Sequence, residues 1–292
     1  MKKPLNRYAL SRGLSWLASA DPEELAGQAM QVIPEVTARR VGITGAPGVG
    51  KSTLTAHLAR LRNGTERLGV LALDPSSPVS GGAILGDRVR MDGLDGNEQL
   101  YVRSIGSRRT NDGLADNLPE MLDLMDEHGF DEVLLETVGI GQAEHAVRYQ
   151  VDTLILVLLP DSGDVVQAMK AGIIEMADIF VVNKSDLAGA QRMAADINRI
   201  AALSKLDNDA WKPPVVLTSE KEPESFSILS RHIDDHQAWL KGQPQLKSLM
   251  RARYRLRRII ERRLMLYLEE QGDDFYEKKL DCQVSTALHA IS

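Results

Sequence analysis

Short apolar runs alternate with longer amphipathic segments along most of this chain. Seven runs rich in β-branched or apolar residues have the length of buried strands, at residues 41–44, 70–73, 100–104, 132–137, 153–159, 179–182 and 215–218. Most of these runs are separated by segments long enough for a helix. Strands that alternate with helices predict an α/β fold, a mainly parallel sheet with helices on both faces. In such sheets, ligands bind where the strands end.

Both ends of the chain lack strand-like runs. Residues 11–20 and 21–33 have apolar positions at helical spacing, and Pro34 is expected to end the second of these helices. Residues 232–239 and 246–270 have the same spacing. We therefore expect three parts, which are an N-terminal helical extension at 1–38, an α/β domain at 39–222 and a C-terminal helical region at 223–292.

Composition restricts the class of protein. With 292 residues, of which 43% are hydrophobic, the chain can bury a full core, and its net charge of −6 does not favour a nucleic-acid partner. The single cysteine, Cys282, leaves neither a disulfide framework nor a thiolate metal cluster. No run approaches the ~20 apolar residues of a membrane span, and the first residues lack the apolar stretch of a secretory signal. We therefore expect a cytoplasmic protein with no membrane partner.

A phosphate-binding motif follows the first predicted strand. The letters GAPGVGKS at residues 45–52 fit the pattern G-x-x-x-x-G-K-[ST] and precede a predicted helix at 53–62. The glycines let successive backbone N–H groups point at a phosphate, and the helix N-terminus adds partial positive charge. We expect Lys51 to reach the β- and γ-phosphates and the Ser52 hydroxyl to ligate Mg²⁺. The predicted nucleotide contacts here are Gly45, Pro47, Gly48, Val49, Gly50, Lys51, Ser52 and Thr53.

A second motif predicts which base is bound. The letters NKSD at residues 183–186 follow the strand at 179–182 and match the N-K-x-D pattern of GTPases. The carboxylate of Asp186 can accept hydrogen bonds from the guanine N1–H and 2-amino groups, whereas adenine offers no such donor pair and would leave the carboxylate unsatisfied. We expect Lys184 to lie along the base and Asn183 to tie this loop to the phosphate-binding loop. Ser219, after the last strand, is a further candidate, and GTP and GDP are the predicted ligands.

Carboxylates at strand ends are candidates for holding Mg²⁺ beside the phosphate-binding loop. Asp74 ends the second predicted strand and Glu136 ends the fourth. Asp87 is a third candidate, and a helix cap or a loop carboxylate is the alternative for each of the three. No glutamine directly follows the Glu136 motif as in Ras-type enzymes, so the water-positioning group stays open and we expect slow intrinsic hydrolysis. The predicted metal ligands are Ser52, Asp74 and Glu136.

Two longer segments resemble a known family. Residues 73–88, LDPSSPVSGGAILGDR, and residues 136–144, ETVGIGQAE, closely resemble the methylmalonyl-CoA mutase-associated GTPases, which are also described as arginine/ornithine transport system kinases or ATPases. The resemblance covers residues 40–239. It implies a P-loop NTPase fold and a homodimeric, Mg²⁺-dependent GTPase. It also implies that this GTPase binds an adenosylcobalamin-dependent methylmalonyl-CoA mutase, gates cobalamin loading and protects the mutase from inactivation.

The same resemblance assigns roles to individual positions. It places Lys51, Ser52, Asp74, Asp87 and Glu136 in nucleotide binding, metal binding or hydrolysis, and the catalytic residues that it implies are Lys51, Asp87 and Glu136. Residues 160–170 resemble an additional switch segment of the family. Arg109 and Asp112 stand at two positions where the family has glycine, so the conformation of this loop, and with it contact to the partner, stays open. Residues 220–225, EKEPES, replace a small glycine-containing turn.

Two other functions remain open. A metallochaperone GTPase that delivers nickel shares both motifs, but metal delivery needs Cys/His clusters, and this chain has one cysteine and six scattered histidines. A kinase or ATPase linked to arginine/ornithine transport would need a base near an acceptor hydroxyl, and the N-K-x-D motif favours GTP over ATP. The apolar stripe of the helix at 246–270 predicts either a homodimer interface or packing on the chain's own sheet.

Overall fold

The computed structural model describes most of the chain, namely residues 4–20, 24–25, 37–64, 66–75, 99–107, 117–137, 143–160, 172–204, 210–242 and 244–291. The chain divides into two compact units. The first unit comprises residues 1–19 and 32–243, and the second comprises residues 20–31 and 244–292. The helix predicted at 21–33 lies almost entirely outside the described residues.

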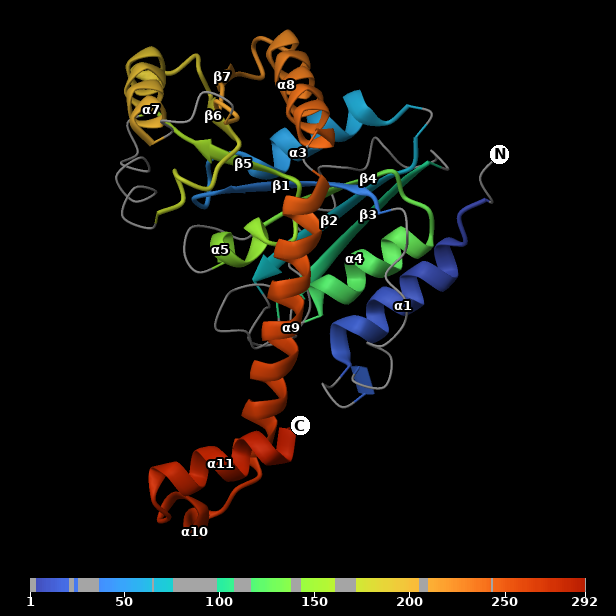
Figure 1. Ribbon diagram of the computed structural model, residues 1–292. Helices are drawn as coiled ribbons and strands as arrows, with labels where there is room; N and C mark the ends of the chain where they lie inside the picture. Colours follow the sequence, from blue (N-terminus) through green and yellow to red (C-terminus); the bar gives the residue numbers. More distant parts are fainter. Residues whose placement is uncertain are drawn as a thin grey trace. The chain divides into compact units, whose positions relative to one another are not determined.

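A seven-stranded parallel sheet forms the centre of the first unit (Figure 1). The order of its strands is β3-β2-β4-β1-β5-β6-β7, and every neighbouring pair is parallel. This sheet confirms the predicted α/β fold. The strands are β1 (Arg39–Gly45), β2 (Leu68–Pro75), β3 (Leu100–Ser107), β4 (Glu132–Glu136), β5 (Thr153–Leu158), β6 (Ile179–Asn183) and β7 (Val215–Thr218).

Helices cover both faces of this sheet, because successive side chains of each strand point to opposite sides. In β5, Ile155 and Val157 pack in one apolar cluster with residues of α3 and α8, whereas Leu156 and Leu158 pack in another with residues of α7. Helix α1 packs against α4. The helices of this unit are α1 (Arg7–Ser19), α3 (Lys51–Arg62), α4 (Leu118–Glu127), α5 (Ala143–Arg148), α7 (Ala190–Ser204) and α8 (Glu224–Lys241).

The second unit is helical. The helix predicted at 246–270 is present as α9 (Pro244–Glu269). It is followed by α10 (Asp273–Tyr276) and α11 (Leu280–Ile291), for which the sequence analysis gave no separate bounds within the helical region expected at 223–292. Helix α11 packs against α9, and Phe275 lies buried with its ring edge-on to that of Tyr267. None of the described helices is long and apolar enough to cross a membrane.

The carboxyl ends of the strands place the sequence motifs along one edge of the sheet. Strand β1 runs into the glycine-rich segment, and residue Ile43 of β1 is in register with Glu136, the last residue of β4. Strands β6 and β7 end at Asn183 and Thr218, which are also paired in register. This edge is where parallel α/β sheets bind ligands. The domain boundary at residue 222 stays a prediction; helix α8, which follows it, packs against α3 in the first unit.

Candidate nucleotide-binding site

The glycine-rich segment forms a tight loop around the start of α3. Gly48 and Gly50 have φ angles of 82° and 94°, a region that glycine adopts without steric strain. Helix α3 begins at Lys51, whose side chain is 7% exposed and whose Nζ donates to the carbonyl oxygens of Gly45 at 2.8 Å and Ala46 at 3.0 Å. The loop therefore combines a buried cation with the N-terminus of a helix, the combination that binds phosphate in proteins.

Asn183 joins the N-K-x-D motif at residues 183–186 to this glycine-rich loop. Its Nδ2 atom donates to the carbonyl oxygen of Val49 at 2.7 Å, and its Oδ1 atom accepts from the Thr218 hydroxyl at 2.9 Å. A Cβ atom added to Gly50 would lie 2.4 Å from Asn183 Nδ2. The two predicted motifs, which are more than a hundred residues apart in sequence, are therefore held in one polar network.

Gly50→Ala is expected to lower the free energy of unfolding by about 1–3 kcal/mol, because the new methyl group meets Asn183 at a positive φ. Urea unfolding followed by tryptophan fluorescence measures this change, since Trp16, Trp211 and Trp239 all lie in the first unit. Gly64→Ala is the matched control, because a Cβ there meets no atom within 4 Å. Equal losses in the two variants would contradict the steric explanation.

The Ser52 hydroxyl and the Glu136 carboxylate come together beside the loop. Ser52 Oγ donates to Glu136 Oε1 at 2.6 Å, and both residues are buried. Thr137 holds this end of β4 against β1, because its backbone N–H donates to Ile43 O at 3.0 Å and its hydroxyl donates to the Thr44 hydroxyl at 2.9 Å. A hydroxyl and a carboxylate are hard oxygen ligands, so this pair fits the ligand chemistry of Mg²⁺.

Some predicted site residues have no described side chain. Asp74 lies near the end of β2, where Ala72 is in register with Glu136, but nothing is described of its side chain. Asp87 lies outside the described residues, and so do Arg109, Asp112 and the switch segment from residue 161 onwards. Their predicted roles stay predictions.

The remaining loop residues surround the network described above. Val49 is fully buried, whereas Pro47 is exposed and Thr53 is half-buried in the first turn of α3. Lys184 has a φ of 53°, an uncommon conformation for a residue with a side chain, and its Nζ lies 3.4 Å from the carbonyl oxygen of Gly48. The side chain of Lys184 thus extends from the base motif back to the phosphate-binding loop.

Asp186 has two partners in the segment that follows β7. Its Oδ1 atom accepts from the Ser219 hydroxyl at 2.7 Å, and its Oδ2 atom lies 2.7 Å from the ammonium of Lys221. The hydrogen bonds of Lys221 and Ser219 lower the pKa of Asp186 to about 2, so this carboxyl is ionised at neutral pH. Sequence reasoning identified Ser219 but missed Lys221; the only signal was a lysine two residues after Ser219.

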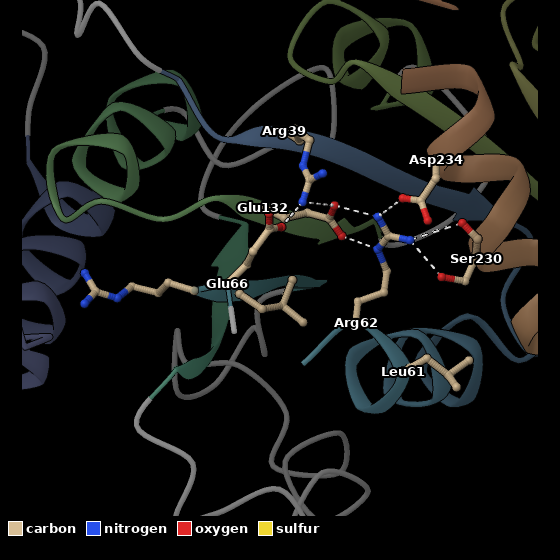
Figure 2. A pocket seen from close by; sticks show the side chains of 9 residues that line it. Arg39, Leu61, Arg62, Glu66, Glu132, Ser230 and Asp234 are labelled. Atoms are coloured by element: carbon tan, nitrogen blue, oxygen red, sulfur yellow. Dashed lines mark hydrogen bonds and ion pairs between the residues drawn. The ribbon is translucent and has the colours of Figure 1, made fainter. Parts of the chain in front are cut away.

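A polar pocket of about 370 Å³ lies at the opposite edge of the sheet, where β1, β2 and β4 begin (Figure 2). Its charged lining residues balance one another, and none of them is a predicted site residue: Arg39, Arg62, Arg67, Glu66, Glu132 and Asp234. Burial by itself would lower the pKa of Arg62, but its hydrogen bonds and charge interactions with Glu132 and Asp234 outweigh burial and raise it. We interpret this pocket as the surface of an ion-pair network rather than as the nucleotide site.

Known proteins resemble this chain over most of its length. Residues 10–273 match the family model described as methylmalonyl Co-A mutase-associated GTPase MeaB. The chain belongs to the MeaB family. A putative GTPase of Pyrococcus abyssi is 40% identical over 216 residues, which cover 73% of this chain and 67% of that protein. A probable GTPase of Mycobacterium tuberculosis is 38% identical over 258 residues, which cover 84% of this chain and 76% of that protein.

The MeaB family consists of P-loop GTPases, so membership identifies this chain as an enzyme that hydrolyses GTP. A solved structure supports the same fold. The crystal structure of an LAO/AO transport system kinase superimposes with a TM-score of 0.64 at 23% identity, and the match covers 99% of this chain and 98% of that one. At this level of identity the similarity shows the fold alone.

Proposed function

We propose that this MeaB-family GTPase is a chaperone of a cobalamin-dependent mutase, in which GTP binding and hydrolysis gate cobalamin loading and protect methylmalonyl-CoA mutase. The observation that supports this proposal is the match to a family model described as mutase-associated over residues 10–273. A cytoplasmic location belongs to the same proposal.

The proposed nucleotide site lies along the carboxyl edge of the sheet. The backbone N–H groups between Gly45 and Thr53 bind the phosphates, except at Pro47, which has no N–H and only shapes the loop. The base lies between Lys184 and Ser219, and its N1–H and 2-amino groups donate to Asp186. The short distances from Asn183 to Val49 and from Ser219 to Asp186 support this arrangement, because they hold the phosphate loop and the base loops in one network.

The proposed metal ligands are Ser52, Asp74 and Glu136. The 2.6 Å contact between the Ser52 hydroxyl and Glu136 supports this set, since two hard oxygen atoms already lie side by side in a buried position. Bound Mg²⁺ would neutralise negative charge on the β- and γ-phosphate oxygens.

The side chains of this protein would promote hydrolysis by holding the reacting groups in place and by stabilising the negative charge that develops on the phosphate oxygens. Water attacks the γ-phosphorus, and the bond from this phosphorus to the bridging oxygen of GDP breaks. Lys51, buried at the start of α3, supplies a fixed positive charge for the oxygen atoms on which negative charge develops. Asp87 and Glu136 are the proposed carboxylates that assist hydrolysis.

A homodimer is part of the proposal. Several large apolar side chains of the second unit are exposed, and on α11 they recur every fourth residue, as in one stripe of a helix. Exposed apolar stripes of this kind often mark an interface between subunits. The exposed side chains are Leu249, Leu256, Ile260 and Met265 on α9, and Leu280, Val284 and Leu288 on α11.

The alternative functions find less support. Within the described part of the chain, no three or more His, Cys, Asp or Glu side chains come together as a metal site, so nothing there favours metal delivery. The solved structure described as a transport system kinase shares the fold, and at 23% identity this similarity does not extend to the kinase activity.

Steady-state GTP hydrolysis, measured with and without an adenosylcobalamin-dependent methylmalonyl-CoA mutase, tests the proposal. We expect slow intrinsic turnover that the mutase stimulates, by at most the ~10³- to 10⁵-fold that partner proteins produce in other GTPases. Asp186→Ala is expected to raise KM for GTP without creating activity on ATP. A rate of GTP hydrolysis that does not change when the mutase is added would exclude this partner, but it would not contradict the GTPase activity.

A further inference from the structure

The ammonium group of Lys221 forms an ion pair with Asp186, the carboxylate that is proposed to recognise guanine. Its Nζ is 2.7 Å from Asp186 Oδ2, while Ser219 Oγ is 2.7 Å from Asp186 Oδ1. Both oxygen atoms of Asp186 are therefore engaged by donors from the segment that follows β7. Guanine recognition needs the same two oxygen atoms, because the base presents its N1–H and 2-amino donors side by side.

The backbone that carries Lys221 is held by a set of short hydrogen bonds. The N–H of Lys221 donates to Ser219 Oγ at 3.2 Å, and the N–H of Glu222 donates to Ser219 O at 3.0 Å. The N–H of Ser219 in turn donates to Ser225 Oγ at 3.2 Å, at the first turn of α8. The turn thus has a defined conformation that directs the lysine toward Asp186.

The lysine side chain itself can leave without disturbing this turn. It is 76% exposed, whereas the side chain of Asp186 is 26% exposed. An ion pair with one such exposed member is weakened by water and contributes little to folding stability. The pair can therefore open when another donor reaches Asp186, and its effect falls on ligand binding rather than on the fold.

We propose that Lys221 is a specificity-determining residue of the base site, whose ammonium group competes with guanine for Asp186 Oδ2. This inference rests on the proposed role of Asp186 in guanine recognition. Guanine, which has both the N1–H and the 2-amino donors, displaces the ammonium group from Asp186. The loss of the ion pair offsets part of the affinity that the new hydrogen bonds to guanine provide. A base with one donor, such as hypoxanthine, leaves Lys221 in place, so the carboxylate stays satisfied.

The consequence is a smaller difference in affinity between the two bases. Without Lys221, guanine meets no ammonium group on Asp186 Oδ2, whereas hypoxanthine leaves this oxygen without a donor from the protein or the base. Removing the lysine is therefore expected to tighten the binding of guanine nucleotides and to widen the discrimination against inosine nucleotides.

Lys221→Ala and Lys221→Gln test this inference in equilibrium titrations with a fluorescent GDP and in competition with unlabelled GDP and IDP. We expect the Kd for GDP to fall by about two- to fivefold in both variants, and the ratio of the IDP Kd to the GDP Kd to rise by a similar factor. Both changes should shrink at about 0.5 M salt, where the ion pair is screened. Lys241→Ala, which removes the same charge from an exposed position at the end of α8, should change neither quantity.

The titrations distinguish a failure of the Lys221 inference from a failure of the proposed guanine site. Unchanged or weaker GDP binding in the Lys221 variants would overturn the inference, and so would an unchanged ratio of the two affinities. Asp186→Ala belongs in the same titrations. If Asp186→Ala binds GDP as tightly as the unmodified protein, the proposed guanine site itself is wrong, whatever the Lys221 variants do.

Discussion

Lys51→Ala is expected to reduce kcat/KM for GTP hydrolysis by about a hundred- to a thousandfold, the loss seen when one fixed donor to a developing negative charge is removed. Lys51 is 7% exposed, and its Nζ is already held by the carbonyl oxygens of Gly45 and Ala46. The side chain therefore needs little reorganisation to meet the phosphate oxygens. No other cation among the described residues has an ammonium group buried at the start of α3.

The measurement is steady-state hydrolysis of GTP, together with a titration of GDP. We expect the loss to be larger for hydrolysis than for GDP affinity, because the charge of Lys51 acts most strongly where charge builds up in the transition state. Lys241→Ala controls for the removal of one positive charge elsewhere in the first unit. Thermal unfolding must show that Lys51→Ala is folded; a folded variant with unimpaired hydrolysis would contradict the assignment.

Arg62→Met is expected to lower the free energy of unfolding of the first unit by about 3 kcal/mol, the lower end of the range for breaking a buried ion pair. Arg62, at the end of α3, forms a paired contact with Glu132, including Nη2 to Oε2 at 2.8 Å, and also reaches Asp234 and Ser230 of α8 (Figure 2). Glu132 is 2% exposed, so its charge would remain buried. The loss stays at the lower end because Arg39 Nη2 lies 3.4 Å from the same carboxylate.

Urea unfolding followed by tryptophan fluorescence measures this loss in the first unit, which contains all three tryptophans. Arg199→Met is the control, because Arg199 forms an exposed pair with Asp196 on α7 and its removal should change stability by less than about 0.5 kcal/mol. The double variant Arg62→Met with Glu132→Leu should recover most of the stability, since no buried charge then remains unpaired. A double variant as unstable as Arg62→Met would show that packing, not charge, causes the loss.

The segments that the sequence predicted correctly are those governed by local patterns. The apolar run at 153–159 is buried on both faces in β5, and the run at 179–182 is buried in β6. The glycine-rich segment forms a loop before a helix because Gly48 and Gly50 tolerate positive φ angles and Lys51 continues into α3. Such features depend on neighbouring residues only, and a single sequence contains that information.

Only the tertiary structure determines which distant residues meet. The order of the strands places β4 between β1 and β2, and this brings Glu136 to within 2.6 Å of Ser52. The periodicity of a strand indicates that its faces are buried, but it does not identify the neighbouring strand. The sequence therefore named both residues as metal ligands without predicting that they touch.

The same distinction applies to the charged groups. The sequence by itself indicated the fold class, the glycine-rich loop before α3 and the N-K-x-D motif, because each is encoded in local patterns of residue types. The contacts of Lys221 with Asp186, and of Arg62 with Glu132 and α8, were decided by the tertiary structure. The physical reason is that the energy of an ion pair depends on the distance between two charges and on their exposure to water, and packing sets both quantities.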